Sequence, residues 1–349
     1  MKKFSILLAL AALALAGCNG GNQENSGNPP TAQNGGSGNS PPAKDFTITV
    51  IAKSTTNPVF QYALAGAKAA AADLGPKNHT HIQIDWETPA NEDGQVQAQN
   101  IDQAVDRHVD AILISCSDAA KVTGSINKAV DAGVPVMTFD SDAPDSKRFA
   151  FYGVDDEAAG AEVMDELAKQ VKGLTNVAIL SGNPNAPNLK KRVDGATTEA
   201  AKYPNIKLLA QPFYLEHETP DDASQVVTNA MSAHPEIQAW AMIGGWPLFA
   251  KSLLTELPSR HVKVVSVDAL PAELAYVDAG IAPVLLAQPC YKWGYASVGI
   301  IVDHVLNKKE VPVINPMPLV PVTKANLGDW ARTLKSWGAD VDPKYLAMK

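Results

Sequence analysis

Strand-like and helix-like segments alternate along most of the chain, beginning at Phe46. This alternation is typical of parallel sheets with helices on both faces, so we expect an α/β fold. The apolar runs that predict strands lie near residues 48–52, 82–86, 111–115, 134–139, 149–154, 177–181, 206–213, 239–243, 262–267 and 283–288. The segments that predict helices include residues 60–74, 95–107, 121–132, 158–172 and 189–202.

The length of this region predicts two lobes. About 300 residues exceed what one hydrophobic core accommodates comfortably. The strand expected at 149–154 follows the strand at 134–139 with no helix between them. We place the first crossover between the lobes at this break in the alternation.

The N-terminus has the features of an exported protein. Met1 to Lys3 are basic at two positions, and residues 4–16 form an apolar run that is too short to span a bilayer. Residues 1–17 therefore read as a secretory signal peptide. The run ends in Leu-Ala-Gly-Cys, which resembles a bacterial lipobox and implies that Cys18 carries lipid. An ordinary signal peptide followed by an incidental cysteine is the alternative.

Residues 18–45 are rich in Gly, Asn, Ser, Pro and Gln, and this composition predicts a flexible linker. The chain has 29 Lys and Arg against 37 Asp and Glu, a formal charge of −8. An acidic chain without a basic cluster argues against nucleic-acid binding and against a basic membrane-binding face. Cys116 and Cys290 either pair in an oxidising compartment or remain two buried thiols, and their spacing does not decide between these.

Single polar side chains follow several of the expected strands. The carboxyl ends of parallel strands are where α/β folds bind ligands. Planar side chains with two hydrogen-bonding atoms can each hold adjacent hydroxyl groups, and aromatic rings suit the C–H face of a sugar. The candidate polar residues are Asn57, Asp140, Arg192, Asp268 and Gln288, and the candidate aromatic residues are Phe60, Tyr214 and Trp246. The alternatives are helix capping for Asn57, surface ion pairs for the charged residues and core packing for the aromatic ones.

Signatures of catalysis, metal binding and cofactors are missing from the sequence. There is no G-x-S-x-G or H-E-x-x-H motif, and none of the seven histidines lies at ligand spacing with an acid or a thiol. His79 and His81 alternate at a strand edge, where a solvated pair is expected rather than a metal site. Residues 245–252 approach P-loop spacing, but Ala250 replaces the second glycine and Pro247 removes a backbone donor. We therefore expect no cofactor and no nucleotide hydrolysis.

At these same positions the chain resembles periplasmic sugar-binding proteins of the ribose-binding type, the solute receptors of ABC importers. The likeness runs from about Phe46 to Pro318. The matching stretches are T-N-P-V-F (56–60), V-D-A-I-L-I-S (109–115), A-G-V-P-V-M-T-F-D (132–140), Gly160, N-L-K-K-R-V-D-G (188–195), V-V-S-V-D-A (264–269) and Q-P-C-Y-K-W-G-Y (288–295).

The resemblance implies which residues contact ligand. The family's contacts fall on Asn57, Phe60, Asp140, Arg192, Asp268 and Gln288. The chain departs from the ribose-type pattern at Val59, at Gly244 and at Ser141, which stands where a ligand-binding arginine is usual. Trp246 follows Gly244 by two residues, and the Tyr214 region carries a small insertion. These departures leave room for another pentose, a hexose or a deoxy sugar.

The resemblance also implies two lobes joined by three crossovers near Val154, Gln288 and Pro318, with a hinge that closes on the ligand. The expected division is an N-terminal lobe of 46–154 plus 289–317 and a C-terminal lobe of 155–288 plus 318–349. Trp330, Leu334 and Trp337 share one helical face, so we expect the tail to pack on a lobe.

The implied function is that of a monomeric, membrane-anchored lipoprotein in the cell envelope. It would bind a monosaccharide and deliver it to an ABC permease. The alternatives are a sensory receptor for a membrane kinase or chemoreceptor, and a carbohydrate-active enzyme that uses Asp140 and Asp268.

Overall fold

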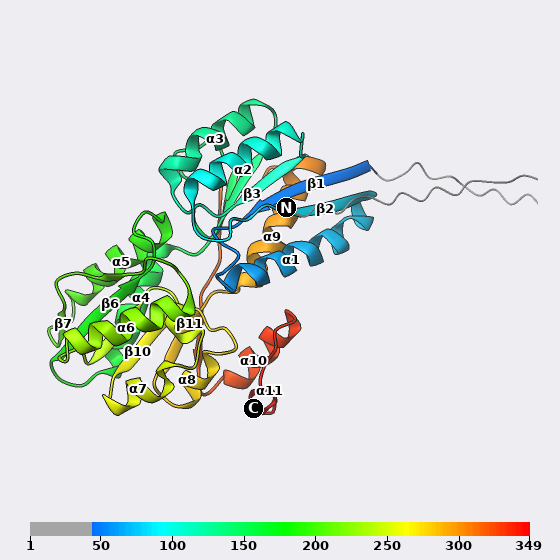
Figure 1. The fold of residues 1–349 in the computed structure, drawn as a ribbon. Helices are drawn as coiled ribbons and strands as arrows, with labels where there is room; N and C mark the ends of the chain where they lie inside the picture. The colour runs from blue at the N-terminus through cyan, green and yellow to red at the C-terminus, as the bar shows by residue number, and fades with distance from the viewer. Residues whose placement is uncertain (1–43) are drawn as a thin grey trace, which may run out of the picture. The chain divides into compact units, whose positions relative to one another are not determined.

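Two sheets, each covered by helices, make up residues 44–349, the part of the chain that this computed structural model describes (Figure 1). The predicted signal peptide, the lipidation site at Cys18 and nearly all of the predicted linker lie outside the described residues. The predicted α/β class is confirmed.

The N-terminal sheet has six strands, all parallel. Its central strands are buried along their whole length, as expected for a sheet with helices on both faces. Its strands, in order across the sheet, are β12 (Ile314–Pro316), β5 (Ala150–Gly153), β4 (Val136–Phe139), β3 (Ala111–Ile114), β1 (Lys44–Ile51) and β2 (Thr80–Trp86).

The C-terminal sheet repeats this order, except that the strand that comes last in the sequence lies at one edge and is antiparallel. One strand predicted at 206–213 is in fact two short strands that both pair with the same neighbour. Its strands, in order, are β13 (Val320–Thr323), β11 (Val284–Ala287), β10 (Lys263–Val267), β9 (Ala239–Met242), β6 (Thr175–Ser181) and β7 (Ile206–Leu208), with β8 (Phe213–Tyr214) also beside β6.

In both sheets the first strand in the sequence lies between the second and the third. The direction of winding therefore reverses beside β1 and beside β6. Such switch points leave a crevice outside the carboxyl ends of the strands, and this crevice is the usual ligand site of open α/β sheets.

Two pairs of helices cover the N-terminal sheet, one pair on each face. The first pair packs closely because it has glycine at its contact. A Cβ at Gly66 would lie 1.9 Å from the carbonyl oxygen of Tyr291, and one at Gly294 would lie 1.9 Å from that of Ala63. The pairs are α1 (Val59–Leu74) with α9 (Cys290–Ile301), and α2 (Gly94–Asp106) with α3 (Ala119–Asp131) (Figure 1).

The C-terminal sheet is covered in the same way. One face carries α4 (Asp156–Gln170) and α5 (Pro187–Ala200), which approach each other at Gly160 and Gly195. The remaining helices of this sheet are α6 (Pro220–Ala233), α7 (Leu253–Ser259) and α8 (Leu274–Asp278). They complete one hydrophobic core that includes Trp240 and Tyr276.

The chain passes between the two sheets three times. It leaves β5 at Gly153 for α4, leaves β11 at Ala287 for α9, and leaves β12 at Pro316 for β13. All three connections are short, and they lie near the three predicted crossovers. The two-lobed architecture with three crossovers is therefore confirmed.

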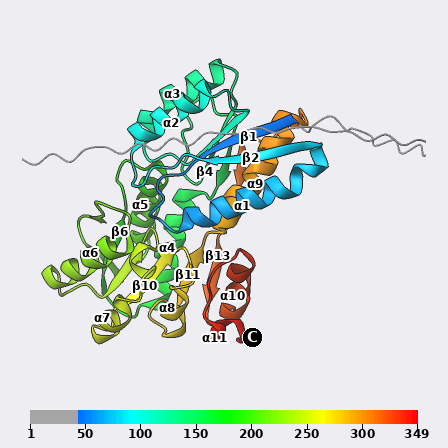
Figure 2. The same ribbon diagram turned by 45° about the vertical axis from the view of Figure 1, so that its right-hand side comes forward.

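The C-terminal tail contains α10 (Leu327–Ser336) and α11 (Pro343–Leu346), with α10 against β13 (Figure 2). Trp330 and Leu334 belong to the core of the C-terminal sheet, and the Trp330 indole donates to the carbonyl oxygen of Ala269 over 2.7 Å. Trp337 instead stacks on Tyr291, with ring centroids 6.0 Å apart, and also contacts Tyr62. The tail thus packs on the C-terminal sheet and reaches two helices of the N-terminal sheet.

Cys116 and Cys290 are both free and buried, so the alternative of two separate thiols is the one observed. They lie in different hydrophobic clusters of the N-terminal sheet. Within residues 44–349, none of the helices has both the length and the hydropathy that crossing a membrane requires.

Candidate functional site

A buried cavity lies where the carboxyl ends of the two sheets meet. Both sheets and three α-helices contribute side chains to it, because the residues after β1, β4, β9, β10 and β11 and the N-terminal parts of α1, α5 and α9 all reach this point. Seven of the nine predicted binding residues line the cavity: Asn57, Phe60, Asp140, Arg192, Trp246, Asp268 and Gln288.

Asp140 and Asp268 occupy equivalent places at the ends of β4 and β10. Both have left-handed backbone conformations, with φ of 56° and 78°. Asp tolerates this region better than most residues, and backbone strain of this kind gathers at functional sites. The two carboxylates are thereby turned from their strands into the cavity from opposite sides.

Neighbouring polar groups fix both carboxylates. Asp140 accepts from the Ser115 hydroxyl at 2.7 Å and from the Asn188 amide at 3.2 Å. Asp268 accepts from the Gln288 amide at 2.9 Å and from the backbone N–H of Gly245 at 3.2 Å. Burial raises the pKa of Asp268, although Gln288 and Arg192 oppose this shift. Both carboxylates keep further acceptor capacity for a ligand's hydroxyl groups.

Arg192 is the cation of the C-terminal side, and it is 2% exposed. Its Nε donates to Asp156 at 2.8 Å, one Nη to Gln288 at 2.9 Å and the other to the carbonyl oxygen of Ile243 at 3.3 Å. Burial opposes the guanidinium charge, yet Asp156, Asp140 and Asp268 raise the pKa of Arg192. Burial raises the pKa of Asp156 to about 6, against the opposing effect of Arg192.

Aromatic rings form the apolar part of the wall. Phe60 stacks on Trp293 with centroids 6.0 Å apart, and Trp246 is 3% exposed. Asn57 both lines the cavity and accepts from the backbone N–H of Val59 at 3.3 Å, at the start of α1. Asn57 can therefore hydrogen-bond to the backbone at the helix start, as the helix-capping alternative expects, and still line the site.

The two remaining predicted residues do not line the cavity. Ser141 is fully buried, and its hydroxyl has no hydrogen-bond partner within residues 44–349. Tyr214 is 44% exposed, because β8 lies at the margin of the sheet and the chain then turns Leu215 into the core. Glu218, four residues after Tyr214, lines the cavity instead.

Lys53, Asn188 and Glu218 line the cavity and were missed by the sequence analysis. The Lys53 ammonium donates to Asn188 at 3.2 Å and lies 3.6 Å from Glu92. Burial alone disfavours this charge, but the carboxyl groups around it raise the pKa of Lys53. Two signals were available: Lys53 directly follows an apolar strand, and Asn188 precedes Arg192 by one helical turn.

Comparison with known proteins agrees with this geometry. Residues 48–309 match the family described as periplasmic binding protein domain. The chain belongs to this family. Over 251 residues it is 27% identical to the xylitol-binding protein of Mycolicibacterium smegmatis, an alignment that covers 71% of this chain and 70% of the relative. It is 28% identical over 254 residues to the ribose import binding protein of Bacillus subtilis, covering 68% and 72% of the two chains.

A solved structure has the same fold as this periplasmic binding protein. An ABC transporter solute-binding protein from Burkholderia graminis, crystallised with D-arabinose, superposes with a TM-score of 0.74 at 30% identity. The match covers 81% of this chain and 97% of that one. Both relatives are named as binding proteins, and members of this family are located outside the cytoplasm.

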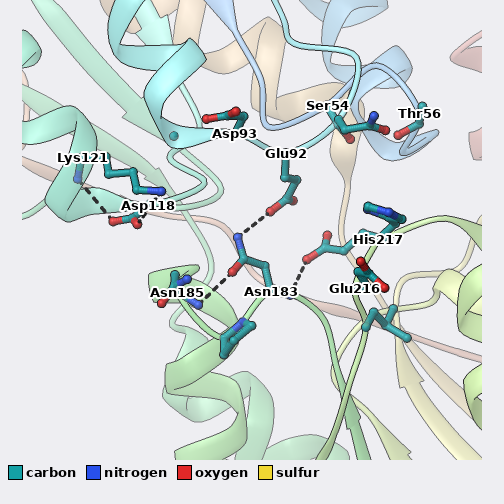
Figure 3. Close-up of a pocket in the computed structure, with 15 residues that line it drawn as sticks. Ser54, Thr56, Glu92, Asp93, Asp118, Lys121, Asn183, Asn185, Glu216 and His217 are labelled. Carbon is teal, nitrogen blue, oxygen red and sulfur yellow. Dashed lines mark hydrogen bonds and ion pairs between the residues drawn. The ribbon is translucent and has the colours of Figure 1, made fainter.

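An outer pocket lies beside the cavity of this periplasmic binding protein and shares Glu218 with it. Asn183 stands at its centre, where its side-chain amide donates to Glu92 at 3.1 Å and its backbone N–H donates to Glu218 at 3.1 Å (Figure 3). The pocket measures about 340 Å³, and most of the side chains around it are polar or charged. We refer to it as the vestibule.

The central cavity measures only about 20 Å³. A single water molecule needs about 10–15 Å³ on this measure. A monosaccharide therefore enters only when the lining side chains or the two lobes move apart. Contacts between the lobes at Asn188 and Asn183 hold the cavity closed in this structure.

Proposed function

We propose that this periplasmic binding protein is an extracytoplasmic receptor that binds a neutral monosaccharide or polyol between its lobes and delivers it to an ABC permease. The observation that carries the proposal is the convergence of seven predicted sugar-binding side chains on one buried cavity. They come from both sheets, so a ligand that contacts Asp140 and Asp268 together favours the closed state.

The charges around the cavity support a neutral ligand. Each cation is already satisfied, Arg192 by Asp156 and Lys53 by Glu92 and Asn188. Asp140 and Asp268 remain as acceptors for hydroxyl groups. A sugar acid or phosphate would meet these two carboxylates without a free cation, and such like-charge contact is costly. The charges of the site thus support an uncharged ligand.

The site residues in this proposal are Asn57, Phe60, Asp140, Arg192, Trp246, Asp268 and Gln288, with Phe60 and Trp246 as the stacking surfaces. The lobes comprise residues 46–154 plus 289–317 and residues 155–288 plus 318–349. Export by residues 1–17 and lipidation at Cys18 would anchor a monomer to a membrane. Replacing Cys18 by Ser should move the protein from the membrane fraction to the soluble fraction.

The test is a thermal-shift screen of residues 43–349 against pentoses, hexoses, deoxy sugars, polyols and nucleosides. A ligand at 100 times its Kd stabilises the folded state by about 2.7 kcal/mol. The proposal expects that at least one sugar or polyol raises the Tm, and that Asp268→Asn reduces this increase by about half or more. A response to nucleosides alone would overturn the substrate class, and turnover of a glycoside would overturn the receptor.

A further inference from the structure

Glu218 is a buried acid that the proposed binding mechanism does not use. It stands two residues before α6, is 7% exposed, and borders both the central cavity and the vestibule. Its carboxyl group is fitted against the backbone after β6. A Cβ at Gly182 would lie 2.1 Å from its Oε1, and the N–H of Asn183 donates to the same oxygen at 3.1 Å.

The carboxyl group of Glu92 approaches from the other lobe, on the loop between β2 and α2. Its side chain is 10% exposed. One oxygen accepts from the Asn183 amide at 3.1 Å. The other lies 3.6 Å from the Lys53 ammonium and has no hydrogen-bond partner among the described residues. Two buried carboxyl groups from opposite lobes thus share one neighbour, Asn183, and one nearby cation, Lys53.

The other charged groups around the pair do not neutralise it. At the rim of the vestibule Lys121 is paired with Asp118 at 3.8 Å, while Asp93, Glu216 and His217 line the same pocket. On the cavity side Arg192 is held by Asp156, and Asp140 adds a further negative charge near Lys53. Burial and the neighbouring Glu92 carboxylate raise the pKa of Glu218 to about 8.

We propose that Glu218 is a positioning residue whose protonated carboxyl group allows the Glu92 loop and the Asn183 loop to close on each other. Closure brings Lys53 and Asn188 together beside Asp140, so the proton on Glu218 acts on the ligand site through these neighbours. When Glu218 ionises, two buried carboxylates confront each other with one ammonium between them. The lobes then separate more readily.

This inference rests on the proposed ligand site, and it predicts that ligand affinity decreases as pH rises. The closed form binds the Glu218 proton more tightly than an open form in which the carboxyl group is solvated. The pKa of Glu218 is therefore lower in the open form than in the closed form. At a pH between these two values, closure takes up a proton, and ligand affinity falls by up to about tenfold per pH unit as pH rises. Above the closed-state value of about 8 the affinity no longer depends on this group.

The test compares wild type, Glu218→Gln and the matched control Glu216→Gln, which removes an exposed carboxylate two residues away on the same loop. Affinity for the best sugar from the screen is measured by calorimetry from pH 6 to pH 9. Wild type and Glu216→Gln should weaken at least tenfold, and Glu218→Gln should stay within twofold. An unchanged slope in Glu218→Gln, or a flat wild-type profile, would overturn the inference.

A ligand-free measurement separates this inference from the proposed function. Small-angle scattering of the three proteins at pH 6 and pH 9 reports lobe separation directly. Wild type should expand at pH 9, and Glu218→Gln should not. If no sugar binds but this difference appears, the proton-dependent closure stands and the function falls; if sugars bind and the difference does not appear, the proposed function stands and the proton-dependent closure falls. Glu92→Gln, which removes the opposing charge, should also suppress the expansion, and it replaces Glu218→Gln should that variant fail to fold.

Discussion

Asp140 and Asp268 share a left-handed backbone at the ends of two equivalent strands, one in each sheet. Asn tolerates this conformation, whereas a β-branched residue does not. Replacing either residue by Asn should preserve folding and weaken sugar binding about 10- to 100-fold, because a hydrogen bond to a charged group contributes about 1.5–3 kcal/mol. Calorimetry checks the affinity. Asp131→Asn, which changes an exposed carboxylate, is the control, and wild-type binding by both site variants would contradict the assignment.

Arg192 and Asp156 form a buried ion pair, so their substitutions should not be additive. Arg192→Met leaves the Asp156 charge buried without its partner and should cost about 3–5 kcal/mol. The double variant Arg192→Met/Asp156→Met removes that charge as well and should recover part of this loss. Guanidinium unfolding of the single and double variants measures the difference. Additive losses would show that the two side chains do not interact.

Asp156 should also make stability depend on pH. Its folded pKa of about 6 lies above its ordinary value, so the folded protein holds a proton that the unfolded chain releases. The contribution to stability is fully present below about pH 4 and is lost as pH rises towards 6, by about 2–3 kcal/mol. The gap in unfolding free energy between wild type and Asp156→Asn should change accordingly between pH 4 and pH 7. A constant gap would contradict the shift.

Two helix glycines should respond oppositely to alanine. A Cβ at Gly160 would lie 1.9 Å from the Arg192 carbonyl oxygen, so Gly160→Ala forces α4 and α5 apart and should cost about 1–3 kcal/mol or more. At Gly124 in α3, such a Cβ would have no atom of another described segment within 4 Å, and Gly124→Ala should stabilise by about 0.5–1 kcal/mol. Urea unfolding compares them. Loss of sugar affinity in Gly160→Ala alone would link this contact to the Arg192 position.

Cys116 and Cys290 should be inert in the native state. Both are fully buried, and burial raises the pKa of each thiol. A thiol reagent such as 5,5′-dithiobis(2-nitrobenzoic acid) should therefore react with neither until denaturant is added, because the thiolate is the reactive species. The rate of colour release with and without denaturant checks this expectation. Rapid reaction of one thiol under native conditions would place it in a region that opens locally.

Most of the fold could be predicted because its signals are local. Strand and helix periodicity located β1 to β6 and α1 to α5 to within a few residues. Strands β12 and β13 escaped because they are short, proline-containing and partly exposed, so they lack an apolar run. The division of the strand predicted at 206–213 escaped for a similar reason: its middle residues are polar or exposed, and only pairing with β6 defines β7 and β8.

The candidate site was predictable where a side chain directly follows a strand, as at Asn57, Asp140 and Asp268. Lys53 was harder, since a lysine at a strand end is usually solvated, and only the facing lobe shows that it is buried. Glu218 depends on a loop whose path the sequence does not define. Tyr214 precedes the same loop, and its side chain is 44% exposed and does not line the cavity.

Trp337 gives the protein a built-in optical reporter. Its indole stacks on Tyr291 and touches Tyr62, while its own helix is rooted in the opposite core through Trp330. Any rotation of one lobe against the other changes the surroundings of this single ring. Intrinsic fluorescence, compared with a Trp337→Phe variant, can therefore follow the hinge in real time without an attached dye. A tag fused after Lys349 should be joined through a spacer, so that α10 stays undisturbed.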